Sequence, residues 1–181
     1  MDFAQTIKIT EAIPTYADFT LGALSSEATA LPSALIWQRI ESYIAWRWVA
    51  RDVTFIVQGH GEWLPPMTPT SITDIKIWRE GDWVTDATTI EPGPLGTRFL
   101  CHAHYKVTAT VGDDSEPPKG VHEAYRRLAE YFVADAGTAG ASDERFSIGG
   151  LDVRVNRKPD WLGAALQNSG AADLLRRYRR A

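Results

Sequence analysis

The chain has 181 residues, enough for one domain with a hydrophobic core, and its 44% hydrophobic and 23% charged residues are ordinary for a globular protein. No apolar run approaches the length of a membrane span, and the first residues lack the layout of a signal peptide, which indicates a cytosol-like compartment. The single cysteine, Cys101, excludes an internal disulfide framework.

Charge is distributed unevenly along the sequence. The whole chain has a net charge of −4, but residues 154–181 contain seven basic and two acidic side chains. This C-terminal part is therefore net +5, and the rest of the chain is net −9 by difference. An acidic body with a basic end indicates two surfaces with different partners.

The N-terminal part is expected to contain a short strand and one helix. Thr6 to Thr10 alternates like a strand, whereas the Ser-, Ala- and Thr-rich residues 25–30 indicate turns or an arm. From Ser33 to Arg51 apolar residues recur at helical spacing, with Ser33 as the expected cap. Trp37 and Trp46 lie off this apolar stripe, so we assign them to a subunit interface.

Residues 52–112 are expected to form an antiparallel β region. Residues 52–58 and 71–78 alternate like strands, and Thr97 to Val111 is the longest strand candidate. Gly59-His60-Gly61 is expected to be a turn. The prolines between Trp63 and Thr70 predict an extended crossing, because proline cannot donate to a sheet ladder. Trp63 and Trp78 are further candidates for the subunit interface.

The clearest predicted helix spans residues 118–136. Its apolar residues recur at steps of three and four, which places them on one stripe. Glu123 precedes Arg127 by four residues, the favourable order for an ion pair on a helix. We expect Leu128 and Phe132 to be buried against the β region or the preceding helix.

Residues 145–155 are expected to be a hairpin or a strand broken at Gly149-Gly150, and two short helices are expected after it. We assign residues 1–155 to a body and 156–181 to a C-terminal segment that the free chain does not hold firmly. Apolar residues and arginines are interleaved in this segment, which favours docking into a protein groove. A nucleic-acid arm and a solvated end are the alternatives. The candidate docking residues are Trp161, Leu162, Leu166, Leu174, Leu175, Arg176, Arg177, Tyr178, Arg179 and Arg180.

No catalytic or metal site stands out from the sequence. His102 and His104 share a strand face, but a metal site needs three or four convergent ligands and this spacing fixes two. Cys101 is expected to be a buried, inert thiol that points away from both histidines. We therefore expect no cofactor and no enzyme activity. A metal-dependent hydrolase and a carbohydrate-binding module, the latter using Trp63, Trp78 and Trp83, stay open as other classes.

Three stretches, taken in order, resemble the head–tail connector (adaptor) proteins of long-tailed bacteriophages and gene transfer agents. Residues 64–78 are similar to that family's proline crossing and following strand. Residues 105–131 resemble its strand, prolines and helix, and residues 169–179 its C-terminal ending. Each motif alone is weak, but their order and spacing together are more specific. The resemblance covers roughly residues 51–181, and the helix expected before residue 51 fits as the family's first helix.

The resemblance implies an α+β fold, with a small helical bundle, an inserted antiparallel β region and a C-terminal helical docking tail. It implies a structural virion protein of the head–tail interface, assembled in the bacterial host cytoplasm as a ring, usually twelve-fold. The C-terminal segment would enter the portal, the opposite face would receive the stopper (head-completion) protein, and DNA would pass through the lumen. An acidic body suits this lumen, because it repels phosphate. A stopper or tail-terminator role is the nearest alternative.

Overall fold

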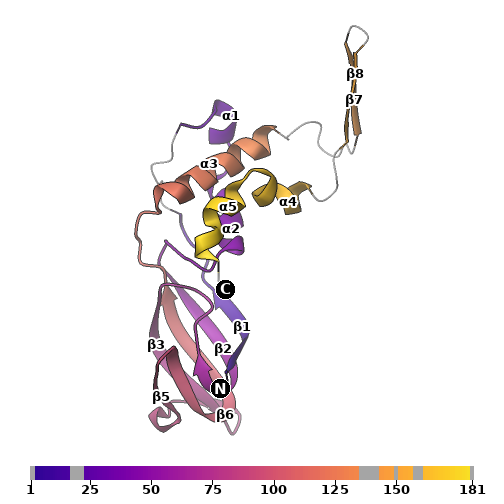
Figure 1. The fold of residues 1–181 in the computed structure, drawn as a ribbon. Helices are drawn as coiled ribbons and strands as arrows, with labels where there is room; N and C mark the ends of the chain where they lie inside the picture. The colour runs from indigo at the N-terminus through magenta and orange to yellow at the C-terminus, as the bar shows by residue number, and fades with distance from the viewer. Residues whose placement is uncertain (1–2, 17–22, 135–142, 149–150, 157–160, 180–181) are drawn as a thin grey trace. The chain divides into compact units, whose positions relative to one another are not determined.

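Residues 3–16, 23–134, 143–148, 151–156 and 161–179 are described by the computed structural model (Figure 1). They form two compact units. The β unit consists of residues 3–16 and 45–116, and the helical unit contains the other described residues. None of the helices described is both long and apolar enough to cross a membrane.

The β unit is built on one antiparallel sheet. Within the described residues its strands follow the order β1 (Gln5–Glu11), β2 (Arg51–Trp63), β6 (Gly96–Val111), β3 (Thr70–Arg79) and β4 (Asp82–Val84). A short 3-10 helix, η1 (Ala87–Thr89), leads into β5 (Ile90–Gly93), which pairs with the first residues of β6. β6 is thus the central strand, paired with β2 along one edge and with β5 and then β3 along the other.

The core of the β unit comes from the alternation of apolar residues along β2 and β6. Val53, Phe55 and Val57 of β2 are each at most 1% exposed, as are Tyr105 and Val107 of β6. The register places Phe55 opposite Val107 and Val57 opposite Tyr105, so these side chains share one face of the sheet. The antiparallel β region predicted from the alternation, including the long strand at residues 97–111, is confirmed.

Trp63, at the end of β2, closes this core. Its ring lies 5.5 Å from the ring of Phe55 and 6.1 Å from that of Phe99. The indole N–H donates a hydrogen bond of 2.9 Å to the hydroxyl of Thr6 on β1, which gives the polar atom of this buried ring a partner. The bond also ties β1, the short strand predicted near the N-terminus, to the far end of β2.

β2 continues through the residues that were expected to form a turn, so that prediction is wrong. Gly59 and Gly61 have φ angles of +117° and +89°, and the pairing with β6 shifts between them. Gly59 faces Ala103 while Gly61 faces Phe99, so residues 100–102 of β6 bulge out of the ladder. The glycines therefore support a bulge and not a reversal of the chain.

The bulge of β6 overturns the expectation that Cys101 is buried, because its thiol is exposed. Regular alternation would place Cys101 on the same side as Phe99 and Tyr105, both of which are buried. The extra residues break that alternation. The hydroxyl of Tyr105 donates a 2.7 Å hydrogen bond to the carbonyl of Cys101, which closes the bulge against the core side of the strand.

The helix predicted over residues 33–51 is shorter than expected. α2 spans Ser33–Tyr43, and Ile44 already has extended backbone angles. The backbone of residues 45–47 then pairs with Thr68: the amide of Thr68 donates to Ala45 at 3.0 Å and that of Arg47 donates to Thr68 at 2.8 Å. These bonds replace the helical ones. Pro32, and not Ser33, is the capping residue, without a side-chain cap.

The helical unit is organised around α3 (Lys119–Ala134), which confirms the helix predicted at residues 118–136. The helices that contact α3 are α1 (Ser26–Thr29), α2, α4 (Trp161–Asn168) and α5 (Ala171–Leu175) (Figure 1). Leu128 is fully buried as predicted, and Phe132 is half-buried. The ring centroids of Tyr125 on α3 and Trp37 on α2 lie 5.1 Å apart, so the two helices pack against each other at this point.

Residues 25–30, expected to be turns or an arm, form the short helix α1. The hydroxyl of Ser25 accepts a 3.2 Å hydrogen bond from the amide of Ala28, as an N-cap does. The amide and hydroxyl of Ser25 also donate to the carboxylate of Glu130 on α3, at 2.8 and 2.9 Å. A single serine therefore caps α1 and attaches it to α3, which sequence spacing did not show.

The hairpin predicted at residues 145–155 corresponds to two paired strands. β7 (Asp143–Ile148) and β8 (Leu151–Asn156) pair with each other, and the 3-10 helix η2 (Arg176–Tyr178) follows α5. The α+β class with an antiparallel β region is confirmed. The helical unit includes α4 and α5, which contact α3; the assignment of residues 156–181 to a docking segment stays a prediction.

Replacing Leu128 with alanine is expected to lower the free energy of unfolding by about 2–5 kcal/mol, through lost transfer energy and a cavity in the helical unit. Leu35→Ala is the matched control, because Leu35 lies on α2 and is 53% exposed. The control should change stability by less than about 0.5 kcal/mol. Chemical denaturation followed by circular dichroism measures both. Equal midpoints for the two variants would show that Leu128 is not a core residue.

Glu123 on α3 is expected to titrate far below an ordinary glutamate. It accepts 2.8 Å hydrogen bonds from Arg126 and from Arg127, and these bonds lower its pKa from 4.5 to about 2. Because the folded-state pKa is depressed, the stabilisation is present above pH 4.5 and is lost as the pH falls toward 2. All three side chains are about one-third or more exposed, so solvent screening limits the contribution to less than about 1 kcal/mol.

Side-chain carboxyl NMR measures this titration directly. The midpoint of Glu123 should lie below the ordinary value of 4.5, and Glu123→Gln should lower the melting temperature slightly at pH 7 but not at pH 2. A midpoint near the ordinary value would mean that the two arginines do not hold the carboxylate in solution.

Candidate functional site

The C-terminal segment predicted to dock on a partner is part of the helical unit. α4 and α5 are joined at Gly170, whose φ of +71° lies in the left-handed region that favours glycine. A side chain at this position would also meet Arg127 of α3 at 3.2 Å. The glycine therefore lets the chain turn sharply while it lies close to α3.

The apolar docking candidates divide into buried and accessible residues. Leu166 is 6% exposed and Leu175 is fully buried, whereas Leu174 and Tyr178 are half-buried. The side chains of Trp161 and Leu162, and all of Arg180, lie outside the described residues. Leu166 and Leu175 are thus buried in this conformation, and the expectation that the free chain does not hold this segment firmly stays a prediction.

The arginines of the segment are exposed. We define the basic cluster as Arg176, Arg177 and Arg179, and none of the three pairs with a carboxylate of the described residues. The guanidinium of Arg177 lies 5.1 Å over the ring of Tyr178. That of Arg179 lies 4.7 Å over the ring of Tyr43 on α2 and donates to its hydroxyl at 3.3 Å. The cluster therefore offers exposed positive charge to a partner, and aromatic rings hold two of its members, Arg177 and Arg179.

The four tryptophans assigned to a subunit interface have different surroundings. Trp37 and Trp63 are each 1% exposed and belong to the cores of their own units. Trp46 is half-buried, and its backbone forms a bridge with Thr68. Trp78 is 44% exposed and packs edge-on against Trp83, with ring centroids 5.0 Å apart. In this conformation Trp78 is the member of this set that offers the largest exposed surface to a neighbour.

The burial of Trp63 also argues against a carbohydrate site formed by Trp63, Trp78 and Trp83. Such a site presents exposed aromatic faces to a sugar, but Trp63 is 1% exposed. Trp78 and Trp83 sit directly opposite each other on the β3–β4 hairpin and contact edge to face. The three indoles therefore do not form one exposed platform.

The histidines of the β unit do not assemble a metal site. The rings of His60 and His102 lie 5.8 Å apart, across the bulge between β2 and β6. His104 is opposite Gln58, further along the ladder. Within the part of the chain that the structure describes, no three His, Cys, Asp or Glu side chains are grouped so that they could hold a metal ion.

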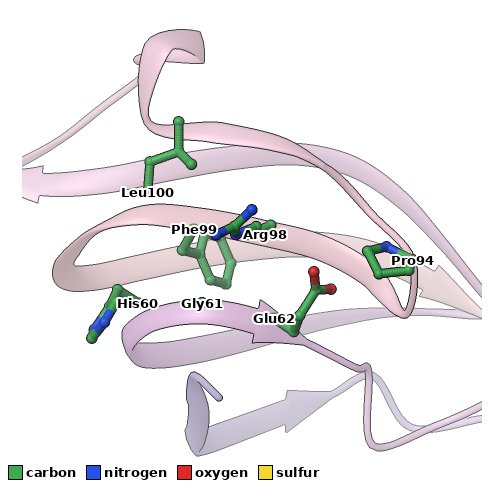
Figure 2. A pocket seen from close by; sticks show the side chains of 7 residues that line it. All are labelled: His60, Gly61, Glu62, Pro94, Arg98, Phe99 and Leu100. Atoms are coloured by element: carbon green, nitrogen blue, oxygen red, sulfur yellow. The ribbon is translucent and has the colours of Figure 1, made fainter. Parts of the chain in front are cut away.

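A cavity of about 430 Å³ lies beside the bulge of β6 (Figure 2). Glu62 of β2 lines it and is 5% exposed, which is rare for a carboxylate. Sequence reasoning missed this residue, because a single glutamate beside a tryptophan at the end of a strand is ordinarily on the surface. The signal that was available is the pair of glycines just before it, Gly59 and Gly61, whose conformations set the local path of β2.

The two leucines at the end of α5 provide a test of which docking candidates belong to the core. Leu175→Ala is expected to lower the free energy of unfolding by about 2–5 kcal/mol, because the side chain is fully buried. Leu174→Ala should cost clearly less, since Leu174 is half-buried. Thermal and chemical denaturation compare them. Equal losses would mean that both leucines, or neither, belong to the core.

No protein-family model matches this sequence, and the search of curated proteins gave no match. Among solved structures, the chain is similar to one from the virion of a native gene transfer agent (GTA) particle. The two are 14% identical and superpose with a TM-score of 0.55, over 97% of this chain and 96% of the other. At this level of identity the likeness shows a common fold, and it extends over nearly the whole of both chains.

Proposed function

We propose that this chain is a structural protein of a virion neck, and that it forms the adaptor ring between the portal and the stopper. The observation that carries this proposal is the shared fold, over 97% of the chain, with a chain from a gene transfer agent virion. A local likeness could reflect one common motif. A likeness that includes both units and the C-terminal helices supports a similar role in a similar particle.

The sequence supports the proposal independently. The three stretches that resemble head–tail adaptors are defined by residue patterns alone. They occur in the same order and cover residues 64–78, 105–131 and 169–179. The residue patterns resemble head–tail adaptors of bacteriophages and gene transfer agents, and the fold resembles a chain from a gene transfer agent virion, so both support a role in a particle of this kind.

The C-terminal surface suits attachment to the portal. The basic cluster stands beside Leu174 and Tyr178, which are half-buried and so offer part of their apolar surface. Arginines around a small apolar set favour a groove with an acidic rim, because the charges guide encounter and fix register while the apolar atoms are buried. Residues 1–153, which are net −9, would face the stopper and line a lumen that repels phosphate and lets DNA slide.

Binding to the cognate portal ring tests this role. Arg176→Glu combined with Arg177→Glu should reduce co-sedimentation with portal rings about tenfold or more, and raising the salt should weaken wild-type binding, because exposed charges are screened. Lys8→Glu combined with Lys119→Glu is the control. It makes the same change in net charge at two exposed residues outside the basic cluster. Circular dichroism confirms that every variant is folded.

Deletion of Arg176 to Ala181 gives a second variant that spares the core residue Leu175. It should remain folded and fail to join portal rings. If the truncated chain still binds portal rings but no longer binds DNA, the segment is a nucleic-acid arm and the adaptor role is contradicted. Binding to the tail-side end of the neck without the portal would favour a stopper or tail-terminator role.

A further inference from the structure

Glu62 has a buried carboxylate oxygen, Oε2, without a hydrogen-bond partner among the described residues. The residue is 5% exposed. Figure 2 shows the side chain reaching from β2 toward the strand that carries Arg98, with Pro94 on the turn beyond. The cavity of about 430 Å³ into which it points is lined by His60, Gly61, Glu62, Pro94, Arg98, Phe99 and Leu100.

The cation in this cavity is bonded elsewhere. Arg98 on β6 lies opposite Glu62 on β2 and, on its other side, opposite Glu91 on β5. Its Nη1 donates a 3.2 Å hydrogen bond to Glu91, and both of these side chains are roughly half exposed. The row across the three strands therefore holds two carboxylates and one guanidinium. Glu62 is the more buried of the two carboxylates, and it has no hydrogen bond to this guanidinium.

The backbone of β5 leaves room for this carboxylate. Gly93 lies beside it, and a Cβ atom added at Gly93 would overlap both oxygens of Glu62. The absence of a side chain here allows the carboxylate to lie against the strand, beside the turn that Pro94 begins. The position of Glu62 thus depends on the shape of its surroundings as well as on its own rotamer.

A buried carboxylate without a partner is costly, because it has given up its hydration without replacement hydrogen bonds. A cation that enters the cavity would supply those bonds. The exposed parts of Pro94 and Leu100, the latter 46% exposed, provide apolar walls for the methylene stem of a lysine- or arginine-like group. A volume of about 430 Å³ is in the range of cavities that bind small ligands.

We propose that this cavity binds an alkyl guanidinium or alkyl ammonium group, with the Glu62 carboxylate as its counter-ion. The group comes either from an arginine or lysine side chain of a protein partner or from a free amine. The site is independent of the proposed neck function, since it is defined by the β unit alone. It is also separate from the basic cluster, which has the opposite charge.

Titration calorimetry of the full chain with agmatine, which carries a guanidinium and an ammonium at the two ends of a four-carbon stem, tests the site. Wild-type protein should bind agmatine and should not bind butylurea, an uncharged molecule with a four-carbon stem. Glu62→Gln should weaken agmatine binding about tenfold or more, because it removes a charge-assisted hydrogen bond. Glu116→Gln is the charge-matched control, because Glu116 is exposed and follows the opposite end of β6. It should leave binding unchanged.

Two further variants separate this site from simpler explanations. Gly93→Ala keeps every charge but displaces the carboxylate, so it should weaken agmatine binding. Arg98→Gln removes the neighbouring positive charge, so binding should be as tight as in wild type or tighter. If wild type fails to bind agmatine and Arg98→Gln binds it, Arg98 itself is the partner of Glu62 in solution and the proposal is overturned. Equal losses in Glu62→Gln and Glu116→Gln would overturn it too, as non-specific attraction.

A short capped peptide, acetyl-Gly-Arg-Gly-amide, distinguishes the two sources of the cation. Tighter binding of the peptide than of agmatine would identify a protein side chain as the natural occupant. Tighter binding of agmatine would identify a free amine. Failure of wild-type protein to bind agmatine, putrescine or the peptide would overturn the site, whereas the role of the chain in a virion neck would be untouched.

Discussion

The pairing of β2 with β6 is the constraint on which the β unit depends. The ladder runs from Arg51 opposite Val111 to Trp63 opposite Thr97, and it sets which side chains enter the core. Because successive residues of a strand face opposite sides, a slip by one residue would move the whole apolar set to the other face. The two glycines of β2 and the bulge of β6 change the register once, near one end. The exposed thiol of Cys101 and the cavity beside Glu62 both result from that change.

Sequence patterns predicted the elements whose side chains alternate strictly or recur at helical spacing. The long strand β6 and the helix α3 belong to this group, because their periodicity extends over several turns or pairs. The end of α2 was missed, since residues 45–47 pair with Thr68, which is distant in the sequence. The bulge was read as a turn for a similar reason, because glycines with positive φ suit both and the partner strand decides.

The candidate site was harder to predict than the fold. Tryptophan, leucine and tyrosine are common both in cores and in interfaces, so composition alone did not separate Trp37 from Trp78 or Leu175 from Leu174. Burial depends on which other element lies above each side chain, and for the C-terminal leucines that element is α3. The exposure of the C-terminal arginines was easier to predict, because long charged side chains are rarely buried without a partner. Glu62 is the exception to this rule, and for that reason sequence reasoning did not single it out.

The two units are interleaved along the chain, and this has a consequence for the order in which they form during synthesis. All described residues of the β unit precede α3, whereas α2 must wait for α3 before Trp37 can pack against Tyr125. When a nascent chain has emerged from the ribosome as far as residue 116, its sheet is therefore complete and the apolar face of α2 is still uncovered. The basic cluster is the last described part to emerge. A chain whose synthesis stops early therefore lacks the basic cluster, even where its sheet is complete.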